Sequence, residues 1–139
     1  IAARPIGGLC SRVLRFARAG GGEPVSLEEV LLRHAVGEDV AAFERERLAA
    51  AVMMIPIPAR GVLKRVDGEA DARAVPGVED VMITAKRDQV MEPLPEAGSY
   101  LGFIFARARD GVDAEGAVRE AHRRLRFDVA PSIEVTAGG

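Results

Sequence analysis

The sequence predicts an α+β fold in which a small antiparallel sheet is covered on one face by a C-terminal helix. Three observations support this prediction. Short apolar runs bounded by proline and glycine recur between residues 48 and 130, the run at 100–107 is apolar on both faces, and a helical apolar stripe follows at 114–125. A two-layer arrangement of sheet and helix buries such a pattern.

The composition is that of a folded protein. The chain has 139 residues, 48% of them hydrophobic and 29% charged, and its mean hydropathy is +0.07. This is too apolar for a disordered chain, and no apolar run approaches the roughly 18 residues of a membrane-spanning helix. The net charge of -2 argues against a nucleic-acid binder. We therefore expect a soluble protein with neither a nucleic acid nor a membrane as its partner.

Soft metal ligands are few, namely Cys10, His34 and His122. They are too few for a structural zinc site, and a single cysteine cannot close an internal disulfide. No basic-then-apolar leader opens the chain, so we expect a cytoplasmic protein. His34 follows apolar Leu31 on the predicted helix, and we expect it to be packed or half-buried.

The first third of the chain predicts two helices and a connection. Apolar residues at helical spacing predict a short helix over 9–17. Ser26 and Glu29 form a capping-box pattern, which predicts a helix from Ser26 to Gly37. The charged segment 38–47 has no clean apolar stripe and is expected to connect two packing units. A basic stripe on the first helix is expected to face solvent; it consists of Arg12, Arg15 and Arg18.

The predicted sheet begins at Leu48. Residues 48–55 are apolar throughout and end at two prolines, which is typical of a buried strand, and residues 100–107 are expected to form the central, best-buried strand. The other expected elements are a partner strand at 62–66, a short helix from Asp67 to Ala74, a third strand at 81–85, a loop at 87–98, an edge strand at 127–130 and a flexible tail at 131–139.

The final helix is predicted to begin at Asp113 as its N-cap. Its apolar residues recur at i, i+3, i+4, i+7 and i+11, which forms one stripe for packing on the sheet. These residues are Ala114, Ala117, Val118, Ala121 and Leu125.

The residues with the clearest chemical potential lie at the start of the chain. Arg4 and Pro5 precede the pair Gly7-Gly8, which in turn precedes a predicted helix. Glycine amides before a helix can approach an anion closely, and an arginine fork can bind the same anion through two hydrogen bonds. From this local pattern alone, a purely structural Gly-Gly turn stays the main alternative.

Several segments of the chain form an ordered set. In the first part they are Arg4-Pro5-Ile6-Gly7-Gly8-Leu9-Cys10-Ser11-Arg12, Ser26-Leu27-Glu28-Glu29-Val30 and Gly37-Glu38-Asp39. In the second part they are residues 52–63, Pro76-Gly77-Val78 and Tyr100-Leu101-Gly102-Phe103-Ile104-Phe105-Ala106-Arg107. In this order, the segments resemble the closing part of an ATP-grasp carboxylate–amine ligase of the L-amino-acid ligase branch. The resemblance covers nearly all of residues 1–130.

The resemblance implies an enzyme that uses ATP and Mg²⁺ to phosphorylate a carboxylate and then lets an amine attack the acyl phosphate. In such ligases a Glu-x-Asn-x-Arg pattern ends the grasp domain. Arg4 falls on the arginine, which faces the reacting carboxylate and phosphoryl group. Ala2 falls on the metal-binding asparagine, which is a departure, because alanine cannot bind a metal; the glutamate would precede Ile1.

Arg4 is therefore the candidate catalytic residue, and Gly7, Gly8 and Ser11 are candidates for binding substrate or phosphate. No metal ligand is assigned. The nucleotide-clamping lysines and remaining metal carboxylates of the family have no counterpart here. ATP and Mg²⁺ are thus expected in the intact enzyme, none is expected on this fragment, and the fragment alone is expected to be inactive.

The resemblance also implies a domain division. Residues 1–37 would be the C-terminal end of the ATP-grasp domain, 38–47 a connection and 48–130 the small C-terminal domain. The chain begins inside an apolar run at Ile1, so we expect it to belong to a longer protein. Its expected partners are the upstream ATP-grasp portion and a small-molecule carboxylate and amine; a homodimer stays open. The alternative is an independent α+β binding or dimerisation module without catalysis.

Overall fold

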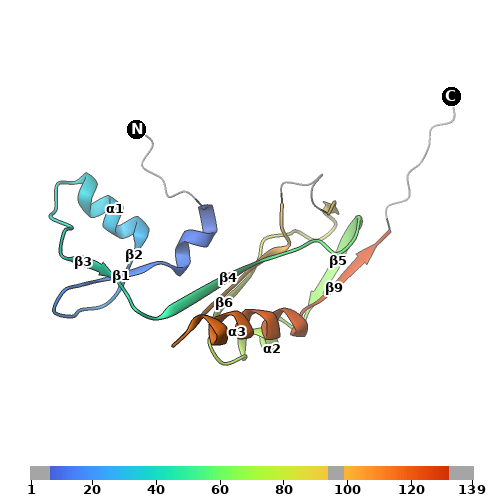
Figure 1. Cartoon of the computed structure of the whole chain (residues 1–139). Helices are drawn as coiled ribbons and strands as arrows, with labels where there is room; N and C mark the ends of the chain where they lie inside the picture. The colour runs from blue at the N-terminus through green and yellow to red at the C-terminus, as the bar shows by residue number, and fades with distance from the viewer. Residues whose placement is uncertain (1–6, 94–98, 132–139) are drawn as a thin grey trace.

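The structure is a computed structural model that describes residues 7–93 and 99–131 (Figure 1). Its helices are the 3-10 helix η1 (Gly8–Val13), α1 (Leu27–Ala35), α2 (Glu69–Arg73) and α3 (Gly111–Arg124). Its strands are β1 (Arg15–Arg18), β2 (Val25–Ser26), β3 (Phe43–Arg45), β4 (Ala49–Ile55), β5 (Gly61–Asp67), β6 (Val78–Ile83), β7 (Val90–Met91), β8 (Gly102–Ala108) and β9 (Arg126–Ala130).

The strands form three antiparallel sheets with the orders β2-β1-β3, β4-β8-β6 and β7-β5-β9. The α+β class and the helix-covered antiparallel sheet are confirmed. The expectation that the predicted strands from Leu48 onward form a single sheet is wrong, because β5 pairs with β7 and β9 and not with β4. Pro56 and Pro58 lack the N–H groups that a hairpin ladder requires, so the chain leaves one sheet before it enters the next.

The core lies between α3 and the sheet β4-β8-β6, and β8 is its central strand, as predicted. Ile104 and Ala106 of β8 are fully buried in this core, together with the predicted stripe of α3. Phe105 points to the opposite face, because side chains alternate along a strand, yet it is also buried. The helix η1 contacts β4 and β8 on that face and accounts for the burial of Phe105.

Both helices of the second half begin at residues other than those predicted. Asp110 caps α3 by accepting a hydrogen bond from the Asp113 amide at 2.9 Å, so Asp113 lies inside the first turn. α2 is preceded by Gly68 with φ +83°, not capped by Asp67. A Cβ on Gly68 would overlap the carbonyl oxygen of Arg124, so the close approach of α2 to the end of α3 requires glycine there.

Residues 7–46 differ most from the prediction. The expected helix over 9–17 is the short 3-10 helix η1 followed by β1, and the expected connection 38–47 contains β3, which pairs with β1. Apolar spacing over nine residues is too short to separate a helix from a helix followed by a strand. A three-residue strand as polar as β3 also leaves no alternating pattern in the sequence.

α1 has the predicted ends, since the Ser26 hydroxyl accepts from the Glu29 amide at 3.1 Å and Gly37 follows the helix with φ +88°. It buries none of its residues, however, and Leu32 is 67% exposed. His34 is exposed as well, contrary to expectation, because no element covers this side of α1 within the described chain. Among the described residues of segment 7–46, Ser11 is the only buried one.

No helix in residues 7–93 and 99–131 is long and apolar enough to cross a membrane. The predicted tail at 131–139 lies outside the described residues apart from Pro131.

Replacing Ile104 with alanine tests the assignment of the core. Ile104 has no exposed surface, so we expect the free energy of unfolding to fall by about 2–5 kcal/mol, measured by urea denaturation. Met54 on neighbouring β4 is 44% exposed, and Met54→Ala should cost about 1 kcal/mol. Equal losses in the two variants would contradict this placement of the core.

Candidate functional site

The glycine pair adopts a backbone conformation that other residues avoid. Gly7 has φ +109° and Gly8 has φ +53°, and beyond the chain neighbours no heavy atom of the described residues lies within 4 Å of a Cβ built on either. Glycine is therefore required here by the left-handed backbone, not by crowding. The helix that follows is a six-residue 3-10 helix, in which the Cys10 amide donates to the Gly7 carbonyl at 3.0 Å.

Ser11 is close to Gly8, but its hydroxyl is already bonded within the protein. Its Oγ lies 2.8 Å from the Gly8 carbonyl oxygen and 2.7 Å from Oε1 of Glu28, and the residue is 5% exposed. The hydroxyl carries one hydrogen, and the two acceptors compete for it. Ser11 thus joins η1 to α1. The Ser11 hydroxyl and the backbone of Glu28 hold the pKa of that carboxyl below its ordinary value.

The predicted site residues are only partly brought together in the described structure. Gly7, Gly8 and Ser11 lie on or beside one turn of η1, and Gly8 lines an open cavity of about 530 Å³. Arg12, Arg15 and Glu28 also line this cavity, so both positive and negative side chains border it. Arg4, the predicted catalytic residue, and Ala2 lie outside the described residues.

Arg12 and Arg18 of the basic stripe are exposed, as expected, but the stripe does not lie on one helix. The Arg12 guanidinium lies 5.4 Å from the ring centroid of Phe105, and it also lies 3.9 Å from Asp80. Arg15 is on β1 and contacts Glu79 at 3.2 Å, while Arg18 lies over the ring of Phe43. Arg12 and Arg15 therefore contact β8 and β6. They can do so because η1 ends at Val13 and the chain then changes direction.

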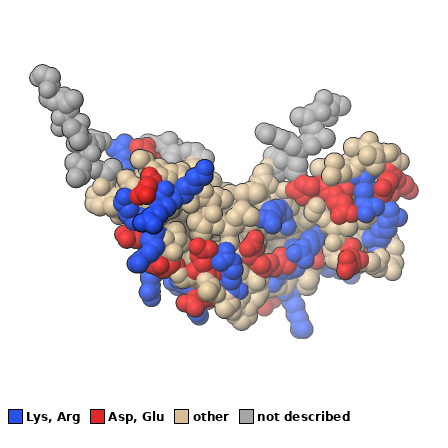
Figure 2. All heavy atoms as spheres, turned by 180° about the vertical axis from the view of Figure 1, so that it is seen from behind, with Lys and Arg blue, Asp and Glu red and all other residues tan. Residues whose placement is uncertain are grey.

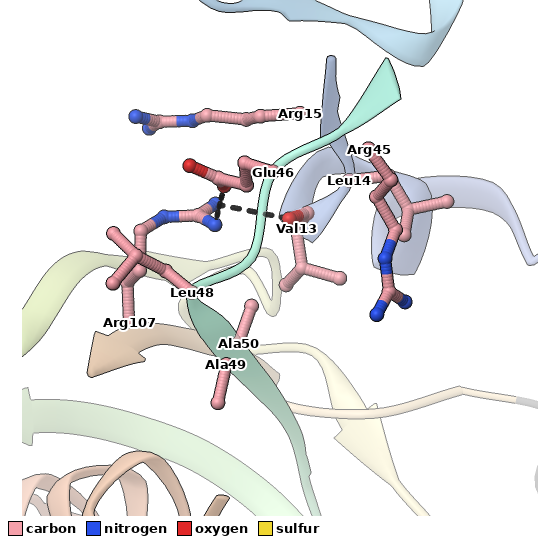
Figure 3. A pocket seen from close by; sticks show the side chains of 9 residues that line it. All are labelled: Val13, Leu14, Arg15, Arg45, Glu46, Leu48, Ala49, Ala50 and Arg107. Carbon is pink, nitrogen blue, oxygen red and sulfur yellow. Dashed lines mark hydrogen bonds and ion pairs between the residues drawn. The ribbon is translucent and has the colours of Figure 1, made fainter. Parts of the chain in front are cut away.

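Arg107 is a site residue that sequence analysis missed (Figure 3). Its side chain is 8% exposed and has three acceptors: Glu46, Glu79 at 3.0 Å and the Val13 carbonyl at 2.9 Å. It borders a cavity of about 280 Å³ between β1 and the start of β4. These partners lie far away in the sequence, so no local spacing reveals them. The available signal was a charged residue near the end of the predicted central strand.

Burial disfavours the charged form of this arginine. It lowers the pKa of the Arg107 guanidinium, and the positive charge of Arg15 lowers that pKa further. Arginine nevertheless stays protonated at neutral pH, because its ordinary pKa is so high. Arg15 and Arg107 face Glu46 and Glu79, so this cluster of four side chains is balanced in charge.

Other charged side chains form ordinary surface pairs. Figure 2 shows acidic and basic residues intermixed over the rear face. Arg119 and Glu115, for example, are about 60% exposed and pair along α3, as their 2.6 Å separation shows. Such pairs contribute little to stability because water and salt screen them. Across residues 7–93 and 99–131, no group of three or more histidine, cysteine or acidic residues is arranged to hold a metal ion.

Replacing Ser11 with alanine tests the bond between η1 and α1. The pKa of Glu28 should rise toward its ordinary value, since its principal hydrogen-bond donor is removed. The stability that this bond gives the parent is complete above the ordinary glutamate pKa of about 4.3 and disappears as the pH falls through the lowered folded value. NMR titration of Glu28 measures the shift. Ser99→Ala is the control, and an unchanged pKa in Ser11→Ala would contradict the assignment.

The fold resembles that of a solved structure, the L-amino acid ligase from Bacillus licheniformis, with a TM-score of 0.64 and 22% sequence identity. The similarity covers 76% of this chain and 27% of the ligase chain. The chain therefore spans about a quarter of the length of that ligase, and at this identity the likeness concerns the fold. No curated protein matches this chain.

The family comparison addresses the second half of the chain. The model of the family described as L-amino acid ligase C-terminal domain 2 matches residues 53–130. These residues run from β4 to the end of β9 and include α3. They contain every buried residue of the apolar core, and of the partly buried residues packed against it only Ala51 lies outside the match. The resemblance noted from the sequence is confirmed, and because the match covers more than half of the chain, the chain belongs to the L-amino acid ligase C-terminal domain 2 family.

Proposed function

We propose that this chain is the C-terminal part of an ATP- and Mg²⁺-dependent ligase that joins an activated carboxylate to an amine. The family match over residues 53–130 carries this proposal. In this proposal residues 1–37 end an ATP-grasp domain, 38–47 connect, and 48–130 form the small C-terminal domain. The substrates are small-molecule carboxylates and amines, with L-amino acids as the class that the family's description suggests.

The proposed reaction has two steps. The substrate carboxylate attacks the γ-phosphorus of ATP, which breaks the bond to the β-phosphate oxygen and releases ADP. The amine then attacks the carbonyl carbon of the acyl phosphate, loses a proton and expels inorganic phosphate, leaving an amide or peptide bond. Negative charge develops on the phosphoryl oxygens in the first step, and on the carbonyl oxygen and the departing phosphate in the second, so fixed positive groups and amide donors accelerate both steps.

In this proposal Arg4 faces the reacting carboxylate and phosphoryl group, and the amides of Gly7 and Gly8 face the same anion. The left-handed conformation of both glycines and the open space beside them support a role for their backbone. Ser11 contributes by holding Gly8 and α1 together, because its hydroxyl is already bonded to Glu28 and the Gly8 carbonyl.

ATP and Mg²⁺ are assigned to the upstream portion of the protein. Ala2 replaces the family's metal-binding asparagine, and the described residues contain no cluster of metal ligands. The uncovered face of α1 supports an upstream partner, since Leu32 and Val36 are 67% and 75% exposed. A self-contained module would be expected to bury such a face, because its exposure disfavours an isolated soluble domain.

Removing the guanidinium of Arg4 in the intact protein, with its upstream portion present, tests this function. Arg4→Ala should lower kcat by about 10²–10³-fold, because one preorganised donor to the developing charge is lost. The assay supplies ATP, Mg²⁺ and mixed L-amino acids, and it measures phosphate release together with peptide products by mass spectrometry. Arg87→Ala is the matched control, since its side chain is 82% exposed.

The outcomes separate the enzyme from its proposed residue. An intact parent that forms no amide with any amino acid contradicts the ligase function. A fully active Arg4→Ala variant removes Arg4 from the chemistry and leaves the ligase function standing. The 139-residue chain alone should release no phosphate.

A further inference from the structure

Arg107 binds the C-terminal end of η1, whereas the glycine pair lies at the N-terminal end of the same helix. η1 begins at Gly8 and ends at Val13, whose carbonyl accepts from Arg107 Nη2 at 2.9 Å. A 3-10 helix rises about 2 Å per residue, so its two ends are only about 10–12 Å apart. A displacement of Val13 therefore displaces Gly8 as well.

A β-bulge places one of the acceptors. The register between β6 and β8 shifts between Val78 and Asp80, which leaves Glu79 as the extra residue on β6. In a regular ladder Glu79 would alternate with Asp80 and point toward the α3 side, where Val81 is fully buried. The bulge turns the carboxylate to the η1 side, where it accepts a hydrogen bond from Arg107 at 3.0 Å and forms an ion pair with Arg15 at 3.2 Å.

The guanidinium of Arg107 suits this position because each of its nitrogens has a different acceptor. Nε bonds Glu79, Nη1 bonds Glu46 and Nη2 bonds the Val13 carbonyl. Figure 3 shows the side chain directed away from α3 toward Glu46 and Val13. Glu46 precedes β4 and its side chain is 16% exposed. One rigid, planar group thus joins the central strand, the bulge, the connection before β4 and the end of η1.

From this geometry we propose that Arg107 is a positioning residue, which fixes the backbone of Gly7 and Gly8 relative to the C-terminal domain. The proposal rests on the proposed ligase function of that glycine pair. Arg107 touches no reacting atom in this scheme. It acts through Val13 and η1, and the amides of Gly7 and Gly8 are placed for the acyl phosphate only while that helix is held.

The variant Arg107→Lys tests this without leaving buried carboxylates unpaired. Lysine keeps the positive charge, but its single nitrogen cannot meet three acceptors in the fork geometry. Arg119→Lys is the matched control, because Arg119 pairs only within α3 on the surface in the described structure.

The first measurement is amide hydrogen exchange in the 139-residue chain. Exchange at residues 8–14 should become about tenfold faster in Arg107→Lys, because a charge-assisted hydrogen bond to the end of η1 is lost. Exchange in α3 should stay unchanged in Arg107→Lys. In Arg119→Lys, exchange should stay unchanged both at residues 8–14 and in α3. Unchanged exchange at residues 8–14, or equal acceleration in α3, overturns the anchoring of η1 by Arg107.

The second measurement is the kinetics of the intact protein. Arg107→Lys should lower kcat by about 100-fold, because displacement of a site by about 1 Å has effects of that size, while the KM for ATP stays at the parent value. A parent-like kcat together with faster exchange at residues 8–14 overturns the positioning role. A parent without ligase activity overturns the proposed function and this role with it, whereas the exchange experiment still reports on the anchor itself.

Discussion

The hydrogen bonds around the Arg107 guanidinium set the relation between the two halves of this chain. A charged group that is 8% exposed is tolerated only when its donors are paired, so Glu46, Glu79 and the Val13 carbonyl must converge on it. Removing one acceptor from this cluster leaves a buried N–H group unpaired, which costs about 1–3 kcal/mol. The segment before β4, the bulge in β6 and the position of η1 each place one acceptor for the Arg107 guanidinium.

The two halves are stabilised by different forces. The C-terminal region has a continuous apolar core between α3 and the sheet β4-β8-β6, with Ile104 and Val81 fully buried. Segment 7–46, in its described residues, buries only Ser11 and is held to the sheet by Arg107, by Arg15 and by the stacking of Arg12 on Phe105. This asymmetry agrees with the family match, which covers residues 53–130. It also agrees with the proposal that residues 1–37 complete a domain whose other part lies upstream.

Because segment 7–46 is held mainly by polar contacts, the proposed positioning of the glycine pair depends on η1. η1 has the left-handed glycines at one end and the Arg107 anchor at the other, and Ser11 in its middle is bonded to Glu28 of α1. The glycine pair is thus linked both to α1 and to the sheet through η1 and short, directional hydrogen bonds. In a ligase that stabilises charge with backbone amides, such support fixes the donors before the reaction begins.

The sequence by itself determined the features that depend on local pattern. The apolar stripe of α3, the central position of β8 and the ends of α1 were all predicted, because periodicity, a capping serine and a terminal glycine act over a few residues. The ordered segments that resemble L-amino-acid ligases were also visible, and the family match confirms the resemblance over residues 53–130. Tertiary structure alone decided the pairing of β5, the short strand β3, the bulge at Glu79 and the role of Arg107. Each of these depends on partners that are distant in the chain, and hydrogen bonding between distant segments leaves no periodic trace in the sequence.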